Sequence, residues 1–223
     1  MVMNAEDAER VSQAVADAEA RSNGEIVTIV ADASDPYYDT ALHWAVAIML
    51  LVPAFFALRP GLLMRIVAFA SGGWAGEHEA ASISAALLAM MAFKFIGVWL
   101  VTRWRPLRIW LTPRGVKAAR VRARAITCFK VGAEKRTVGH TGILIYLSMA
   151  EHVAEIVSDE AIHAKVPPEA WGDAMAALID HVREGRVADG MIAAVDRVGA
   201  ILAEHFPRSA DDRNELPDRI ILL

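Results

Sequence analysis

The sequence predicts a small α/β domain, a mixed β-sheet flanked by helices, that is interrupted by a transmembrane helical hairpin. Two long apolar stretches, at residues 41–58 and 81–101, are each long enough to cross a bilayer as a helix. Strand-like segments lie on both sides of them, at residues 25–31 and 142–148. Because the first strand needs partners to form a sheet, we expect the two flanking parts to fold together as one domain.

The two apolar stretches differ in charge. The first has no formally charged residue and would span about 27 Å as a helix, close to the thickness of the hydrocarbon layer. The second contains Lys94, about 10 Å before the end of the stretch at Val101, so its ammonium is expected to reach the interface there. An ion-conducting role for Lys94 is the alternative. Residues 62–76, between the stretches, predict an interfacial segment, with a re-entrant loop as the alternative.

The basic residues predict the orientation of the hairpin. The loop between the stretches has only Arg59 and Arg65, whereas the segment after the second stretch is rich in bases. These bases are Arg103, Arg105, Arg108, Arg114, Lys117, Arg120 and Arg122. The positive-inside rule places this flank in the cytoplasm, and two spans place the N-terminus there as well. We therefore expect an integral protein of a plasma or inner membrane, without a signal peptide and with both termini cytoplasmic.

The flanking segments read as alternating helices and strands. A helix is expected at residues 5–21 and a basic one at 113–131, with strands at 142–148 and 152–157 in a hairpin. Three more helices follow, at 159–164, from Pro168 to Gly185, and at 187–206. The predicted organisation is thus residues 1–40 as the first part of the α/β domain, 41–102 as the hairpin, and 103–223 as a basic juxtamembrane helix with the rest of the domain.

Five short segments make the sequence similar to the TPM domain family, in its membrane-protein branch. They are Ser22–Val27, Thr141–Ile145, Ala164–Pro167, Gly185–Gly190 and Asn214–Arg219. The resemblance implies a mixed sheet flanked by helices, and members of the wider family have been tied to acid phosphatase activity, calcium binding and photosystem repair. Many members have a glycine-rich turn after the third strand, where this chain reads Ser158-Asp-Glu-Ala-Ile162. This departure weakens the phosphatase expectation.

Acidic residues follow two of the predicted strands. Asp32 and Asp35 come after the first strand, and Asp159 and Glu160 come after the third. If these strands are neighbours, the four carboxylates are expected to converge at one end of the sheet, where they could bind Ca²⁺ or Mg²⁺. The alternative is that they cap helices and lie in solvated loops.

The remaining chemistry favours an interaction module over an enzyme. No Walker A, GxSxG, HExxH or EF-hand motif is present, and the single Cys128 excludes an intramolecular disulfide and a thiolate-rich zinc site. The basic helix at 114–136 indicates contact with the bilayer and its anionic headgroups rather than with nucleic acid. We therefore expect a membrane-tethered interaction or accessory module with a protein partner at the cytoplasmic face. The alternatives are a divalent-metal-dependent phosphohydrolase that uses the four acids and, more distantly, a transporter.

Overall fold

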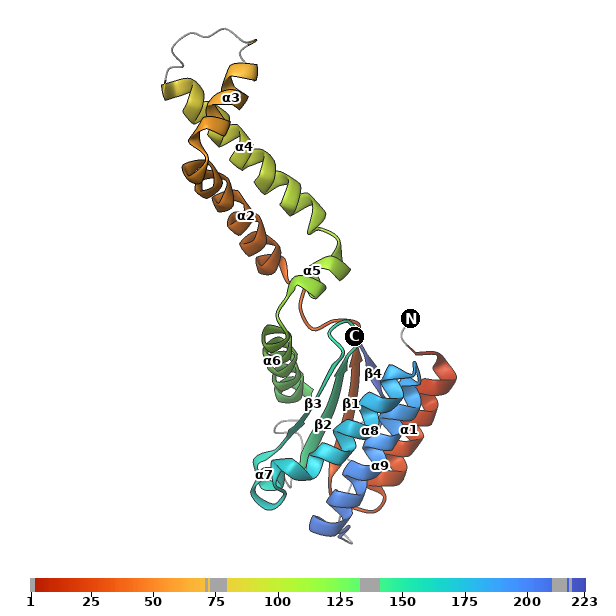
Figure 1. The fold of residues 1–223 in the computed structure, drawn as a ribbon. Helices are drawn as coiled ribbons and strands as arrows, with labels where there is room; N and C mark the ends of the chain where they lie inside the picture. Colours follow the sequence, from red (N-terminus) through yellow and green to blue (C-terminus); the bar gives the residue numbers. More distant parts are fainter. Residues whose placement is uncertain (1–2, 71, 73–79, 133–140, 210–215, 217) are drawn as a thin grey trace. The chain divides into compact units, whose positions relative to one another are not determined.

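A computed structural model describes residues 3–70, 72, 80–132, 141–209, 216 and 218–223 (Figure 1). It divides the chain into two compact units. Unit 1 comprises Met1–Asp35 and Arg114–Leu223, and unit 2 comprises Pro36–Pro113.

Unit 1 is built on a four-stranded mixed sheet in the order β3-β2-β1-β4. The strands are β1 (Glu25–Ala31), β2 (Gly142–Ser148), β3 (Val153–Ser158) and β4 (Ile221–Leu222). Strand β1 pairs in parallel with β2 and with β4, and β2 pairs antiparallel with β3. The predicted fold class is therefore confirmed, and the first and last parts of the chain share one sheet.

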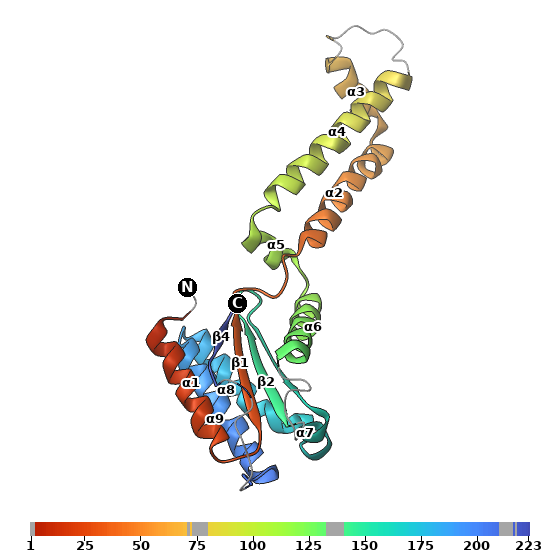
Figure 2. The ribbon, with the colours of Figure 1, turned by 180° about the vertical axis from the view of Figure 1, so that it is seen from behind.

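Helices cover both faces of this sheet (Figures 1 and 2). Helices α1 (Ala5–Glu19), α8 (Gly172–Arg183) and α9 (Val187–His205) lie on one face, and α6 (Arg114–Gly132) lies on the other. The short helices α7 (Glu160–Lys165) and η1 (Pro168–Trp171) lead from β3 into α8.

Alternation along β2 builds a core on each side of the sheet. Ile143, Ile145 and Leu147 belong to the larger core with α1, α8 and α9, whereas Leu144 and Tyr146 belong to the smaller core beneath α6. Successive side chains of a strand point to opposite faces, so a strand buried on both faces is apolar almost throughout.

Unit 2 contains the two long apolar helices, α2 (Tyr38–Leu58) and α4 (Ala80–Val101), which pack against each other. Between them lies α3 (Pro60–Ala70), which overlaps the segment 62–76 that was expected to be interfacial; residues 71 and 73–76 of that segment fall outside the described residues. Among the described residues of unit 2, the sequence prediction missed the short helix α5 (Arg105–Leu111). Its signal is Pro106 in the first turn, a position that proline favours.

Candidate functional site

The two acids after β1 lie at the carboxyl end of that strand. The backbone of Asp32 continues the sheet, since its N–H donates to the Leu223 carbonyl at 2.9 Å and its carbonyl accepts from the Ala150 N–H at 3.0 Å. The carboxylate of Asp35 accepts a hydrogen bond from Arg120 of α6 at 2.7 Å. This ion pair joins the segment that leaves β1 to the helix that covers the sheet.

The two acids after β3 lie at the other end of the sheet. Strand β3 runs antiparallel to β2, so Ser158 is opposite Ile143, near the start of β2. The buried carboxylate of Asp159 accepts from the backbone N–H of Gly142 at 2.9 Å, and the Asp159 N–H donates to the Gly142 carbonyl at 2.9 Å. Glu160 is exposed in the first turn of α7, where the helix dipole stabilises a negative charge.

The structure therefore does not bring Asp32, Asp35, Asp159 and Glu160 together. Convergence required β1 and β3 to be neighbours, but β2 lies between them and β3 runs in the opposite direction. Among the described residues, no group of three or more His, Cys, Asp and Glu side chains is arranged to hold a metal ion. Asp35 forms an ion pair with Arg120, and Asp159 hydrogen-bonds to the backbone of Gly142. Asp32 lies in the loop after β1, and Glu160 lies in the first turn of α7.

The carboxyl end of β1 and β2 carries a different polar constellation, which we call the serine–tyrosine cluster: Ser34, Tyr146, Ser148 and Glu151. The Ser34 hydroxyl lies 3.0 Å from the Tyr146 hydroxyl and donates to the Ser148 hydroxyl at 2.8 Å. Ser148 donates to one oxygen of Glu151 at 2.5 Å, and the Ser34 N–H donates to the other at 3.0 Å. The carboxyl ends of parallel strands are the usual place for ligands in α/β folds.

The hydrogen bonds of this cluster have a defined direction. Each hydroxyl has one proton to donate, and Ser34 and Ser148 use theirs toward Ser148 and Glu151. Tyr146 must therefore donate to Ser34, and its burial raises the pKa of the phenol, which keeps that proton in place. The cluster thus fastens Ser34, four residues before α2 begins, to the end of β2.

Sequence reasoning missed this cluster. The signal available was a tyrosine and a serine two residues apart near the end of an otherwise aliphatic strand, Tyr146 and Ser148. Because the strand has a period of two, both side chains lie on one face. The partners Ser34 and Glu151 come from separate turns, and only the parallel pairing of β1 with β2 brings them there.

A buried carboxyl lies near the opposite end of β1. The Glu19 side chain, at the end of α1, accepts from the Ile26 N–H at 2.6 Å. Burial raises the pKa of Glu19 to about 9, and the nearby Glu25 adds to this shift, while the Ile26 N–H opposes it. Glu25 in turn accepts from the Leu216 N–H at 3.1 Å. Glu19 is therefore a neutral carboxyl at physiological pH.

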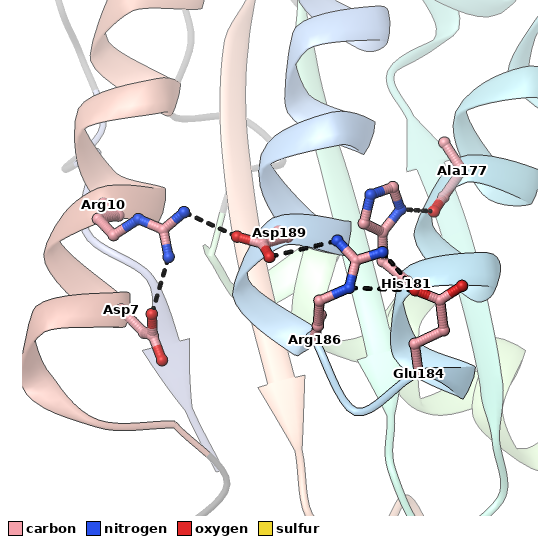
Figure 3. Close-up of polar contacts among 7 residues, drawn as sticks. All are labelled: Asp7, Arg10, Ala177, His181, Glu184, Arg186 and Asp189. Carbon is pink, nitrogen blue, oxygen red and sulfur yellow. Dashed lines mark hydrogen bonds and ion pairs between the residues drawn. The ribbon is translucent and has the colours of Figure 1, made fainter.

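The segment Gly185–Gly190, one of the TPM-like segments, carries a surface ion network (Figure 3). Arg10 of α1 donates to Asp7 at 3.0 Å and to Asp189 of α9 at 2.7 Å. Arg186 pairs with Glu184 and lies 3.5 Å from Asp189. The guanidinium of Arg10 lowers the pKa of Asp189, and that of Arg186 lowers the pKa of Glu184.

The backbone geometry explains why glycine occupies two positions of the same segment. Gly185 has a φ of +78°, the left-handed conformation that ends α8 without steric cost. A Cβ on Gly190 would lie 2.9 Å from the Leu178 carbonyl, so α9 can approach α8 closely only with glycine there. This segment positions α8 and α9 against each other, and α1 is joined to α9 through Arg10.

Comparison with known proteins gives a family-model match over part of the chain and a similar fold. Residues 114–201, from α6 into α9, match the family model of the TPM domain. No curated protein matches the chain. The NMR structure of the BA42 protein from the psychrophilic bacterium Bizionia argentinensis is similar in fold, with a TM-score of 0.56, 17% sequence identity, and coverage of 99% of this chain and 95% of that one.

Proposed function

Because this chain carries a TPM domain, we propose that its α/β unit is tethered to a membrane by the helical hairpin and acts there as an interaction module for another protein. Both termini lie on the cytoplasmic side in this proposal. The two units have separate roles: unit 2 anchors the chain, and unit 1 presents the surface that the partner contacts.

The main support for the proposed membrane tether is the exposure of the two apolar helices. Helices α2 and α4 have 21 and 22 residues and mean hydropathies of 2.2 and 2.0. Only 17% of the apolar window of α2 and none of that of α4 is buried. A core helix of a soluble protein buries its apolar side chains, whereas a bilayer leaves them exposed to lipid. Exposed Leu88 and Phe93 of α4 illustrate the difference.

The basic residues support the orientation and a lipid partner. Helix α6 packs Val121, Ala125 and Phe129 against the sheet. Its exposed bases Arg114 and Arg124 lie close in sequence to the end of unit 2. Anionic headgroups attract such bases by about 1 kcal/mol each near the surface. We therefore propose headgroups, rather than nucleic acid, as the anionic partner of α6.

Two observations favour an interaction role over a phosphohydrolase. The four acids proposed to hold a metal ion lie at opposite ends of the sheet. The outer strand β4 presents apolar residues at the sheet edge, where Ile221 and Leu222 are 40% and 42% exposed. An edge strand can pair with a strand from another chain, and apolar side chains there add to the affinity.

Membrane extraction tests the tether. We expect the full chain to remain in the membrane pellet after alkaline carbonate washing. A variant with residues 36–113 replaced by a Gly/Ser linker should move to the supernatant, because that segment is one compact unit outside the sheet. Circular dichroism of the shortened variant is the control for its fold. Complete extraction of the full chain would contradict the proposal.

Site-specific photo-cross-linking in intact membranes tests the interaction role. A photoreactive amino acid at Leu222 of the edge strand should give a discrete adduct. The same amino acid at Val131 of α6, which is 71% exposed, is the matched control and should give none. Identical adduct patterns from the two positions, or no adduct from either, would count against a partner at the sheet edge.

A further inference from the structure

The strongest unassigned feature is a buried cation in unit 2. Arg108 of α5 is only 6% exposed, and its guanidinium carbon lies 4.4 Å from the ring centroid of Tyr38, the first residue of α2. Its Nε is fully enclosed and has no hydrogen-bond partner among the residues that the structure describes. No hydrogen bond or ion pair to the two terminal nitrogens is found among the described residues, and these nitrogens are not enclosed as Nε is. A buried arginine normally pairs with an anion, because its charge and its five N–H groups are costly to leave unpaired.

Nearby acids do not fill this role. Asp39 lies in the first turn of α2, beside Tyr38 in sequence, and has interactions of its own. Among the described residues, the contact found for the guanidinium is therefore the aromatic face of Tyr38. A cation–π contact does not replace those hydrogen bonds, since the ring offers no lone pair in the plane of the guanidinium.

The helix that carries Arg108 is held against the start of α2. Helix α5 is tied to the start of α2 by two contacts: the Trp44 indole donates to the Leu111 carbonyl at 3.4 Å, and the Thr40 and Thr112 hydroxyls lie 3.2 Å apart. Thr112 also donates to the Arg108 carbonyl at 2.9 Å. These contacts fix α5 against α2, so an anion would meet a preorganised donor set rather than a free surface side chain.

The aromatic side chains near Arg108 in sequence are of the kind expected at the level of lipid headgroups. Trp104 and Trp110, on either side of Arg108 in sequence, are 67% and 76% exposed. Arg103 lies over the Trp99 ring at 5.6 Å. Exposed tryptophans and tyrosines gather at the membrane–water interface, where the phosphate groups of the lipids lie. A phosphate there offers the paired oxygens that a guanidinium binds with two parallel hydrogen bonds.

We propose that Arg108, stacked on Tyr38, binds the phosphate group of a single anionic phospholipid. This inference rests on the proposed membrane tether. It differs from the diffuse attraction of α6 to the membrane, because one side chain in a fixed geometry holds one lipid. The site would anchor the hairpin at its cytoplasmic end and select anionic over zwitterionic lipid at that point.

Native mass spectrometry of the full chain in neutral detergent tests the site. The probes are phosphatidylglycerol, phosphatidylcholine and inorganic phosphate. We expect one phosphatidylglycerol to be retained in preference to phosphatidylcholine, and Arg108→Gln to weaken its retention at least about tenfold. Arg108→Lys should fall between them, because lysine keeps the charge and loses the paired geometry. The matched control Arg103→Gln removes the same charge five residues away in sequence and should retain the lipid.

Each other outcome overturns the site. Equal losses in Arg103→Gln and Arg108→Gln would show a diffuse charge effect. Protection of the chain by inorganic phosphate to the same degree as by lipid would show a general anion site. Circular dichroism and membrane extraction of each variant accompany the measurement, so that a misfolded protein is recognised and Arg108→Lys then decides. A wild-type chain that fails to enter membranes refutes the tether itself, whereas an inserted chain with unchanged lipid retention refutes only the site.

Discussion

Helices α9 and α4 are similar in length, 19 and 22 residues, yet they differ in how many of their residues are buried. Helix α9 buries nine residues and keeps charged residues such as Asp196 and Arg197 on its other side. Helix α4 buries none, although it is the more apolar of the two, and Lys94 is its one charged residue. One-sided apolar patterning predicts packing against protein, and apolar residues on all sides predict lipid. The distribution of apolar residues therefore separates the two units better than their content does.

The sharpest test of this comparison is the same Leu→Ala substitution in the core of unit 1 and on the exposed surface of α4. Leu144→Ala in β2 removes a fully buried side chain and should lower the free energy of unfolding of unit 1 by about 2–5 kcal/mol. Leu88→Ala in α4 removes a side chain that is 67% exposed and should change that free energy by less than about 0.5 kcal/mol. Hydrogen exchange of the β2 amides in the full chain measures both. Equal loss of protection in the two variants would break the distinction between the units.

A smaller effect concerns the buried acid of unit 1. Because the pKa of Glu19 is about 9 in the folded chain and near 4.5 when unfolded, the folded state holds a proton that the unfolded state releases between these values. Stability is therefore highest below about pH 4.5 with respect to this group and falls as the pH rises toward 9. Glu19→Gln keeps the acceptor for the Ile26 N–H and should stabilise unit 1 by about 1–3 kcal/mol at pH 8.

The pH dependence supplies the control for this variant. Wild type and Glu19→Gln should differ little at pH 5 and increasingly toward pH 9 in denaturant titrations. Glu9→Gln on the exposed side of the same helix removes a carboxylate without this effect. A constant difference between wild type and Glu19→Gln across the range would mean that Glu19 is charged in the folded protein.

Local patterns predicted the elements whose causes are local. Strands β1 and β2 are aliphatic runs, and α2 and α4 are uninterrupted apolar stretches, so their places followed from sequence. No single segment of the sequence predicts the direction of β3 relative to β1. It decides whether Asp159 lies beside Asp32 or at the far end of the sheet, and the antiparallel turn at residues 149–152 gives the second arrangement.

The serine–tyrosine cluster and the burial of Arg108 were not predicted, for a related reason. Ser34 and Glu151 are 117 residues apart, and neither has a distinctive sequence neighbourhood. Arg108 was one of the seven bases that predicted the orientation of the hairpin, because the sequence gives the charge of a residue but not its burial. Both features depend on contacts between separate elements, so they became visible only once those elements were placed.

The last prediction tests the separation of the four acids. Asp159→Ala leaves the buried Gly142 N–H without its acceptor and should lower the stability of unit 1 by about 1–3 kcal/mol, whereas Asp159→Asn keeps an oxygen there and should cost less. Asp32→Ala acts at the other end of the sheet, so the two effects should add in the double variant. Thermal melts with EDTA, Ca²⁺ or Mg²⁺ should give the same differences, because Asp32 and Asp159 cannot share an ion across the sheet. An ion-dependent rise in Tm that either substitution abolishes would show that they do share one, and a phosphatase assay of wild type against Asp159→Ala would then be the next comparison.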